Sequence, residues 1–201
     1  MRLWKKTAAC LLALGLAGCL LAGCGAEKKN TFVPGTITQT GYTSPWIGLT
    51  FTLPGSGMTM QSQEDIRQAA GDTMAEDTAD KIADSAELMV TTERGDTMAV
   101  GVVEDPENNL TEQAYLDQTQ RQMEQYKAEE TTYAFDAQTA RTIAGQPFTA
   151  LTCTMHIKGS QPVEMKQTIL VQKKENLFYQ IVISYYDEAA LEAFLDCFSA
   201  A

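Results

Sequence analysis

The sequence predicts an α+β fold in which an antiparallel β-sheet is flanked by helices. First, several segments alternate apolar and polar residues, as half-buried strands do. Second, short turns join the last three of these segments, and such turns suit antiparallel hairpins. Third, apolar residues recur at helical spacing in stretches between and after the strands. Strands with one apolar face bury that face under helices, so we expect helices to cover one side of the sheet.

The first half of the domain is expected to combine strands with two helical segments. Leu49, Phe51 and Leu53 alternate with threonines, which indicates a half-buried strand that ends at a Pro-Gly pair. Ser62 followed by Asp65 offers a helix N-cap with an acidic residue in the first turn. The predicted elements are a strand over 49–53, an extended segment over 57–60, helices over 63–70 and 73–85, and strands over 88–92 and 97–104.

The second half contains the longest predicted helix and the strongest β-region. Asn109 with Glu112 resembles a capping box, and apolar residues at helical spacing follow it. After the β-region, an acidic pair starts a final helix whose apolar residues, through Phe198, share one face. The predicted elements are a helix over 111–129, a short strand over 132–135, strands over 148–158, 163–173 and 177–186, and a helix over 187–198.

The start of the chain has the order of a secretory signal. Arg2, Lys5 and Lys6 precede an uncharged stretch that ends in small residues. The residues Leu21-Ala22-Gly23-Cys24 that close it resemble the lipobox of bacterial lipoproteins. That resemblance implies removal of the leader, attachment of a diacylglycerol to the Cys24 thiol and often acylation with palmitate-like chains at the new amino end. Two acyl chains on one residue are sufficient for stable anchoring.

Two alternatives to this interpretation remain at the level of sequence. Residues 7–26 are about as long as the ~20 residues that span a bilayer, so a retained transmembrane helix is one of them. The other is cleavage before Cys19, where Leu16-Ala17-Gly18-Cys19 fits the same pattern. Cleavage before Cys24 is favoured because the sequence becomes polar directly after this residue.

The expected organisation is a signal peptide over 1–23, a flexible tether over 24–40 and a single α+β domain over 41–201. The tether is small, polar and threonine-rich, although Phe32 and Ile37 could add a short edge strand. The mature protein is therefore expected on the extracytoplasmic side of the cell membrane, held by its lipid. No membrane-spanning segment is expected after Cys24.

The mature protein is strongly acidic. The leader contains three of the 15 basic residues and none of the 26 acidic ones, which leaves 12 against 26 and a net charge of −14. Nucleic acid is disfavoured as a partner because its binding rests on Lys and Arg that neutralise phosphates. Anionic lipid repels such a body, so its place at the membrane depends on the anchor.

Two cysteines remain in the mature domain after Cys24. Cys153 lies on the apolar face of a predicted strand and Cys197 near the edge of the apolar face of the final helix. In an exported chain these two could form one disulfide. The alternative is that both are small buried thiols, since free cysteine commonly behaves as a core hydrophobe.

Few other side chains suggest chemistry. His156 is the single histidine, and it is expected on the solvent face of its strand, where a catalytic role is disfavoured. A stripe of four carboxylates at successive i,i+4 steps could bind a cation but is more typical of a solvated helix face. The stripe consists of Asp72, Glu76, Asp80 and Asp84. A loop with Asp105, Glu107 and Asn109 lacks the glycine and distal glutamate of a calcium loop.

Aromatic residues offer one further candidate site. Trp46 with Tyr179, Tyr185 and Tyr186 could line a ligand cleft, although at strand spacing such residues more often belong to a core. The sequence contains no Gly-rich phosphate loop, no Gly-x-Ser-x-Gly nucleophile elbow and no Cys-x-x-Cys pair. We therefore expect no cofactor, no bound metal and no catalytic residue.

The order of elements and turns resembles a known fold family. A strand that ends in Leu53-Pro54-Gly55, a hairpin, a long helix and then Gly145-Gln146-Pro147-Phe148 before a three-stranded meander and a final helix are similar to the PsbP-like α/β/α sandwich. The resemblance covers residues 42–201 and implies the fold found in many small exported bacterial lipoproteins. The functions of that family are diverse, and no catalytic residue is carried over from it.

Three functions are consistent with these features. The favoured one is a non-enzymatic, lipid-anchored module that binds a protein or a small ligand through its sheet or an adjoining cleft. A second is a hydrolase that uses a pair of carboxylates. A third is an accessory subunit of an envelope complex, which requires an exposed apolar patch.

Overall fold

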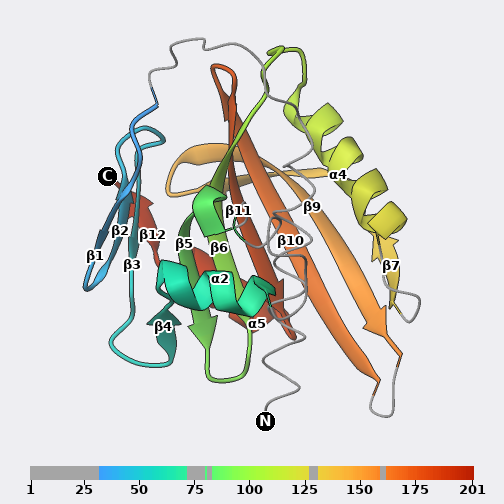
Figure 1. Cartoon of the computed structure of the whole chain (residues 1–201), viewed down its shortest axis with the longest axis horizontal. Coiled ribbons are helices and arrows are strands. Elements are labelled where there is room, and N and C mark those ends of the chain that lie inside the picture. The colour runs from blue at the N-terminus through green and yellow to red at the C-terminus, as the bar shows by residue number, and fades with distance from the viewer. Residues whose placement is uncertain (1–31, 72–79, 81–82, 127–130, 159–161) are drawn as a thin grey trace.

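The computed structural model describes residues 32–71, 80, 83–126, 131–158 and 162–201 (Figure 1). The leader, Cys24 and most of the predicted helix over 73–85 lie outside these ranges. Within them, none of the helices has the length and apolar character needed to cross a membrane.

The described part of the chain contains three helices placed between groups of strands. In chain order they are β1 (Thr36–Thr38), β2 (Gly41–Ser44), β3 (Leu49–Thr52), β4 (Met58–Met60), α2 (Gln63–Gly71), β5 (Ala86–Thr92), β6 (Thr97–Glu104), α4 (Glu112–Tyr126), β7 (Thr131–Phe135), β8 (Thr139–Ile143), β9 (Gln146–Ile157), β10 (Val163–Lys174), β11 (Leu177–Tyr185), α5 (Glu188–Leu195) and β12 (Phe198–Ala200).

In the described part of the chain, the strands form two antiparallel sheets. The large sheet has the order β4-β5-β6-β11-β10-β9-β7, with β8 paired to β9. The small sheet has the order β1-β2-β3-β12, so its last strand comes from the end of the chain. In Figure 1 the small sheet stands on one side of the large sheet and α4 on the other. This architecture confirms the predicted α+β class with an antiparallel sheet flanked by helices.

Both faces of the large sheet are buried, which corrects the expectation of one polar face. Successive residues of β10 alternate between two core clusters: Ile169 and Val171 pack under α4 and α2, and Leu170 packs against the small sheet. Every residue of β11 is buried. Alternate residues of these strands therefore face two different cores, and neither face of the strands is exposed to solvent. The small sheet and α5 supply the second covering layer.

Most predicted strands and helices occur within a few residues of the expected positions. The cap of α2 is confirmed, because Asp65 N donates to Ser62 Oγ (3.1 Å) and Asp65 Oδ2 accepts from Ser62 N (3.1 Å). The final helix is shorter than predicted: α5 ends at Leu195, and Phe198 pairs with Phe51 in β12. Strands β2, β8 and β12 were not predicted.

The start of α4 also differs from its prediction. Asn109 and Glu112 do not form a capping box; the cap is Thr111, whose Oγ1 accepts from Ala114 N at 3.2 Å. Glu112 instead accepts hydrogen bonds from Thr149 Oγ1 (2.9 Å) and from Lys173 N (2.8 Å). Its carboxylate thus fastens the helix to strands β9 and β10.

The described chain packs against the domain from Phe32 onward, inside the segment assigned to the tether. Glu87 accepts a hydrogen bond from Gly35 N (3.0 Å) and another from the hydroxyl of buried Tyr42. A Cβ on Gly35 would lie 2.1 Å from the Tyr42 ring, so only glycine allows this approach. Residues 36–38 then form the edge strand β1, which the sequence had suggested around Ile37.

Two neighbouring lysines at the end of β10 fasten the two covering layers to the large sheet. Lys173 Nζ donates to Asp105 Oδ2 (2.9 Å) and to Leu110 O (2.6 Å) on the α4 side. Lys174 Nζ donates to the carbonyl oxygen of Trp46 on the small-sheet side. Because side chains alternate along a strand, adjacent residues reach opposite faces. The end of β10 therefore contacts both covering layers.

Candidate functional site

The turn between β2 and β3 forms one wall of a cleft. Gly48 N donates to Ser44 O at 2.9 Å, which closes the turn over residues 45–48. Gly48 has φ of 76°, a left-handed conformation that favours glycine. Lys174 reaches this turn from β10, so the turn is held against the end of the large sheet.

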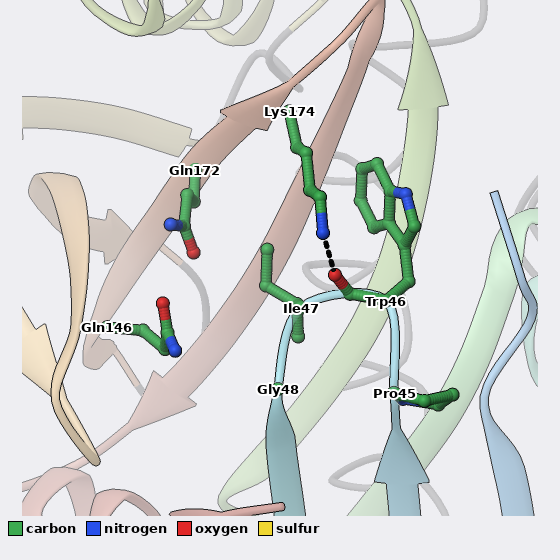
Figure 2. A pocket seen from close by; sticks show the side chains of 7 residues that line it. All are labelled: Pro45, Trp46, Ile47, Gly48, Gln146, Gln172 and Lys174. Atoms are coloured by element: carbon green, nitrogen blue, oxygen red, sulfur yellow. Dashed lines mark hydrogen bonds between the residues drawn. The ribbon is translucent and has the colours of Figure 1, made fainter. Parts of the chain in front are cut away.

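The cleft lies between this turn and the ends of β9 and β10, and its volume is about 370 Å³. That volume falls in the range of small-molecule pockets, roughly 300–1,000 Å³. Figure 2 shows that its walls come from three segments distant in sequence. The lining residues are Pro45, Trp46, Ile47, Gly48, Gln146, Gln172 and Lys174.

Two glutamine side chains point toward one another across the cleft, Gln146 from β9 and Gln172 from β10 (Figure 2). Gln172 Oε1 is buried and has no hydrogen-bond partner within the described ranges. Trp46 Nε1 is likewise buried and unpaired in this part of the chain. An unpaired buried polar group costs about 1–3 kcal/mol. A ligand that donates a hydrogen bond to Gln172 Oε1 would recover that cost for this atom.

The Lys174 ammonium lies at the rim of the cleft beside the Trp46 indole. Its Nζ is 5.2 Å from the centroid of the indole ring, a cation–π distance. The indole also packs against the Phe32 ring, with centroids 5.3 Å apart and the ring planes nearly perpendicular. The indole and the backbone carbonyl of Trp46 therefore hold the ammonium in place, and they leave part of its donor capacity directed outward.

Of the aromatic residues that could have lined a cleft, one does so, and two belong to a core, which is the alternative that their strand spacing favoured. Trp46 lines the cleft, as suggested. Tyr179 and Tyr185 are fully buried in the core between the sheets, where burial raises the pKa of both hydroxyls. Gln146, Gln172 and Lys174 were not identified from sequence.

The other predicted site residues lie elsewhere. His156 is exposed on β9, as expected, with its Nδ1 3.2 Å from Glu164 Oε2. Asp80 and Asp84 of the carboxylate stripe face Arg67, at 2.8 Å and 3.6 Å from its guanidinium nitrogens. Asp72 and Glu76 lie outside the described residues, so the full stripe stays a prediction. Within the described residues, no three His, Cys, Asp or Glu side chains form a metal-binding group.

The disulfide considered for the two domain cysteines is not formed. Cys153 belongs to the core under α4, where burial raises the pKa of its thiol to about 12. Cys197 packs against the core between the sheets, and its Sγ donates to Ala193 O at 3.2 Å. Both thiols are free and lie on opposite faces of the large sheet.

Replacing Gly48 by alanine is expected to cost about 1–2 kcal/mol of unfolding free energy, because a left-handed φ is strained for other residues. The added Cβ would also lie 3.3 Å from Gln146 Nε2 and would narrow the cleft. Urea denaturation of the purified protein measures the loss. Gly55→Ala is the matched control, because a Cβ there meets no atom within 4 Å. An equal loss in both variants would contradict the role assigned to Gly48.

Comparison with known proteins identifies the fold. The sequence matches no protein family profile and no curated protein. The chain is similar to the solution structure of cyanobacterial PsbP (CyanoP) from Synechocystis sp. PCC 6803, with a TM-score of 0.50 and 11% identity over 90% of this chain and 99% of that one. It is also similar to LpqN, involved in cell envelope biogenesis of Mycobacterium tuberculosis, with a TM-score of 0.41 and 9% identity over 75% and 82% of the two chains. The likeness to CyanoP shows that this chain has a PsbP-like fold.

Proposed function

We propose that this protein is a lipid-anchored, extracytoplasmic binding module without catalytic activity, and that its ligand or protein partner enters the cleft beside Trp46. The observation that carries the proposal is the chemistry of the cleft. Its lining offers two primary amides, an ammonium group and the apolar side chain of Ile47. A few polar groups set in an apolar wall are typical of ligand sites.

Sequence features support the location. A basic start, an apolar stretch and the lipobox at Cys24 are the elements that export and lipidation require. A body with a net charge of −14 is repelled by anionic lipid, so it needs an anchor to stay at a membrane surface. The lipid on Cys24 supplies that anchor.

The cleft supports binding better than hydrolysis. A hydrolase of the paired-acid type needs two carboxyl groups beside the substrate, and the cleft lining contains neither Asp nor Glu. The carboxylate of Asp105 is buried on the other face of the large sheet. Burial by itself raises the pKa of Asp105, but hydrogen bonds from Leu110 N and Lys173 Nζ outweigh it and lower the pKa. Asp105 therefore stays ionised as a structural partner of Lys173.

An accessory subunit would require a broad exposed apolar patch. Within the described ranges, the large apolar side chains that are exposed are Val33 (53%) and Ile37 (50%), both near the edge strand β1. Two side chains near one short strand do not make such a patch, so binding through the cleft is the better supported function.

Blocking the cleft should abolish binding of the native partner. Gln146→Trp places an indole in the cleft without touching a fully buried residue, and Gln113→Trp places the same side chain on the exposed surface of α4. Each full-length protein is crosslinked in membranes of the producing cell, purified through a C-terminal tag and compared by mass spectrometry. We expect wild type and Gln113→Trp to retain the same bound molecules and Gln146→Trp to lose them. Equal retention by all three proteins would contradict a binding role for the cleft.

A further inference from the structure

We propose that the cleft recognises the carboxy-terminal end of a peptide, with the terminal carboxylate at Lys174 and the last peptide N–H at Gln172. This inference rests on the proposed binding function of the same cleft and names the chemistry of its ligand. Three features of the lining carry it: an ammonium without a carboxylate partner, an unpaired buried acceptor, and an apolar wall between them.

The first feature is the ammonium group. Lys166 and Lys173 each pair with a carboxylate, at 2.7 Å and 2.9 Å. Among the described residues, no carboxylate lies within 4.0 Å of Lys174 Nζ, although the chain is strongly acidic. The carbonyl of Trp46 occupies one of its three N–H donors. The remaining donors suit an anionic group, and a carboxylate accepts such charge-assisted hydrogen bonds well.

The second feature is the acceptor on the same strand face. Gln172 and Lys174 are two residues apart on β10, so their Cα atoms are about 7 Å apart and their side chains share one face. Gln172 Oε1 is buried without a partner in the described part of the chain, and it requires an N–H or O–H donor. The end of a peptide carries an amide N–H one carbon away from its carboxylate. It therefore carries both an N–H donor of the kind Gln172 requires and a carboxylate of the kind Lys174 suits.

The third feature is the wall that faces these two groups. The Ile47 side chain projects between the glutamines and Lys174, whereas the Pro45 ring points to the other side of the turn (Figure 2). This wall can receive an apolar terminal side chain. Gln146, which faces Gln172, can donate a hydrogen bond to the preceding peptide unit or accept one from it. The ligand best matched by the lining is thus a peptide with a free carboxylate and an apolar last residue.

Fluorescence anisotropy tests this inference on the full-length protein purified in detergent. The probe is a fluorescein-labelled hexapeptide that ends in Ala-Leu with a free carboxylate, and its partner probe is the same peptide as the C-terminal amide. Because the carboxylate supplies the charge-assisted contact, we expect the amide to bind about tenfold or more weakly. Unlabelled N-acetyl-leucine is added as competitor. If N-acetyl-leucine competes as well as the unlabelled hexapeptide, the cleft recognises the same carboxylate and amide groups on a small acid. If it competes more weakly, the cleft recognises a longer peptide.

Variants locate the contact. Lys174→Met should bind the acid about tenfold more weakly and should no longer distinguish acid from amide, whereas Lys174→Arg should keep the distinction. Gln172→Leu should weaken binding of both probes. Lys158→Met and Gln113→Leu remove an exposed lysine and an exposed glutamine outside the cleft, and neither should change binding. Thermal unfolding of each variant shows that its fold is intact.

Equal binding of acid and amide by the wild type would overturn the inference, and so would retained discrimination in a folded Lys174→Met variant. Absence of binding by either probe would also overturn it. If the native partner nevertheless stays bound in the crosslinking experiment and is lost in Gln146→Trp, the binding function stands and only the peptide terminus is excluded. If neither probe binds and Gln146→Trp also retains the native partner, the binding function itself is excluded.

Discussion

Replacing Asp105 by alanine is expected to lower the free energy of unfolding by about 3–5 kcal/mol, as removal of one partner of a buried ion pair does. The side chain of Asp105 is 4% exposed and that of Lys173 is 19% exposed. The substitution leaves the ammonium of Lys173 without its carboxylate and Leu110 N without its acceptor, 2.9 Å away. Urea denaturation at neutral pH measures the loss.

Two comparisons test the cause of that loss. The double variant Asp105→Ala/Lys173→Met should lose less stability than Asp105→Ala, because no unpaired charge remains buried. Glu124→Ala removes an exposed carboxylate from α4 and should change stability by no more than about 0.5 kcal/mol. A loss in Glu124→Ala as large as that in Asp105→Ala would contradict a specific role for the buried pair.

The same ion pair makes stability depend on pH in a defined direction. Although burial raises the pKa of Asp105, its hydrogen bonds lower it below the ordinary value, so the folded state binds its proton more weakly than the unfolded state. The stabilisation is therefore present above the unfolded pKa of about 3.9 and is lost as the pH falls through the folded pKa. The difference between wild type and Asp105→Ala should shrink over this acidic range.

The large sheet could be predicted from sequence because its strands are long and joined by short turns. The small sheet could not, since β1 and β12 have three residues each and β12 pairs with β3 from the other end of the chain. The polar positions of the long strands were also misleading. Thr168 lies on the face of β10 opposite Ile169 and Val171, yet it is buried, with its hydroxyl 2.9 Å from that of Thr152. Alternation alone cannot distinguish a solvated face from a second core with satisfied polar groups.

The cleft was predicted only through Trp46. Gln172 has the pattern of an ordinary solvent-facing strand residue, Gln146 comes before a predicted strand, and Lys174 falls in a predicted turn. Only the tertiary structure brings the turn over 45–48 next to the ends of β9 and β10. A basic residue beside a turn is common in sequences, so no local signal marks Lys174 as part of a site.

Replacing Cys24 by serine is expected to abolish lipidation completely, because a hydroxyl cannot form the thioether to diacylglycerol. In cells labelled with radioactive palmitate, we expect label in the wild type and none in Cys24→Ser. The variant should also keep its leader and run as a precursor 23 residues longer. Cys19→Ser changes the other lipobox and should retain the label. Label lost in Cys19→Ser and retained in Cys24→Ser would move the anchor to Cys19.

The central claim is that a lipid on Cys24 holds this PsbP-like domain at a membrane, where its cleft meets its ligand. Mass spectrometry of the N-terminal peptide, after purification of the protein from membranes of the producing cell, tests that claim most directly. We predict a peptide that begins at Cys24 and carries the mass of a diacylglyceryl group. A peptide that begins at Cys24 without this mass, or one that retains the leader, would contradict the claim.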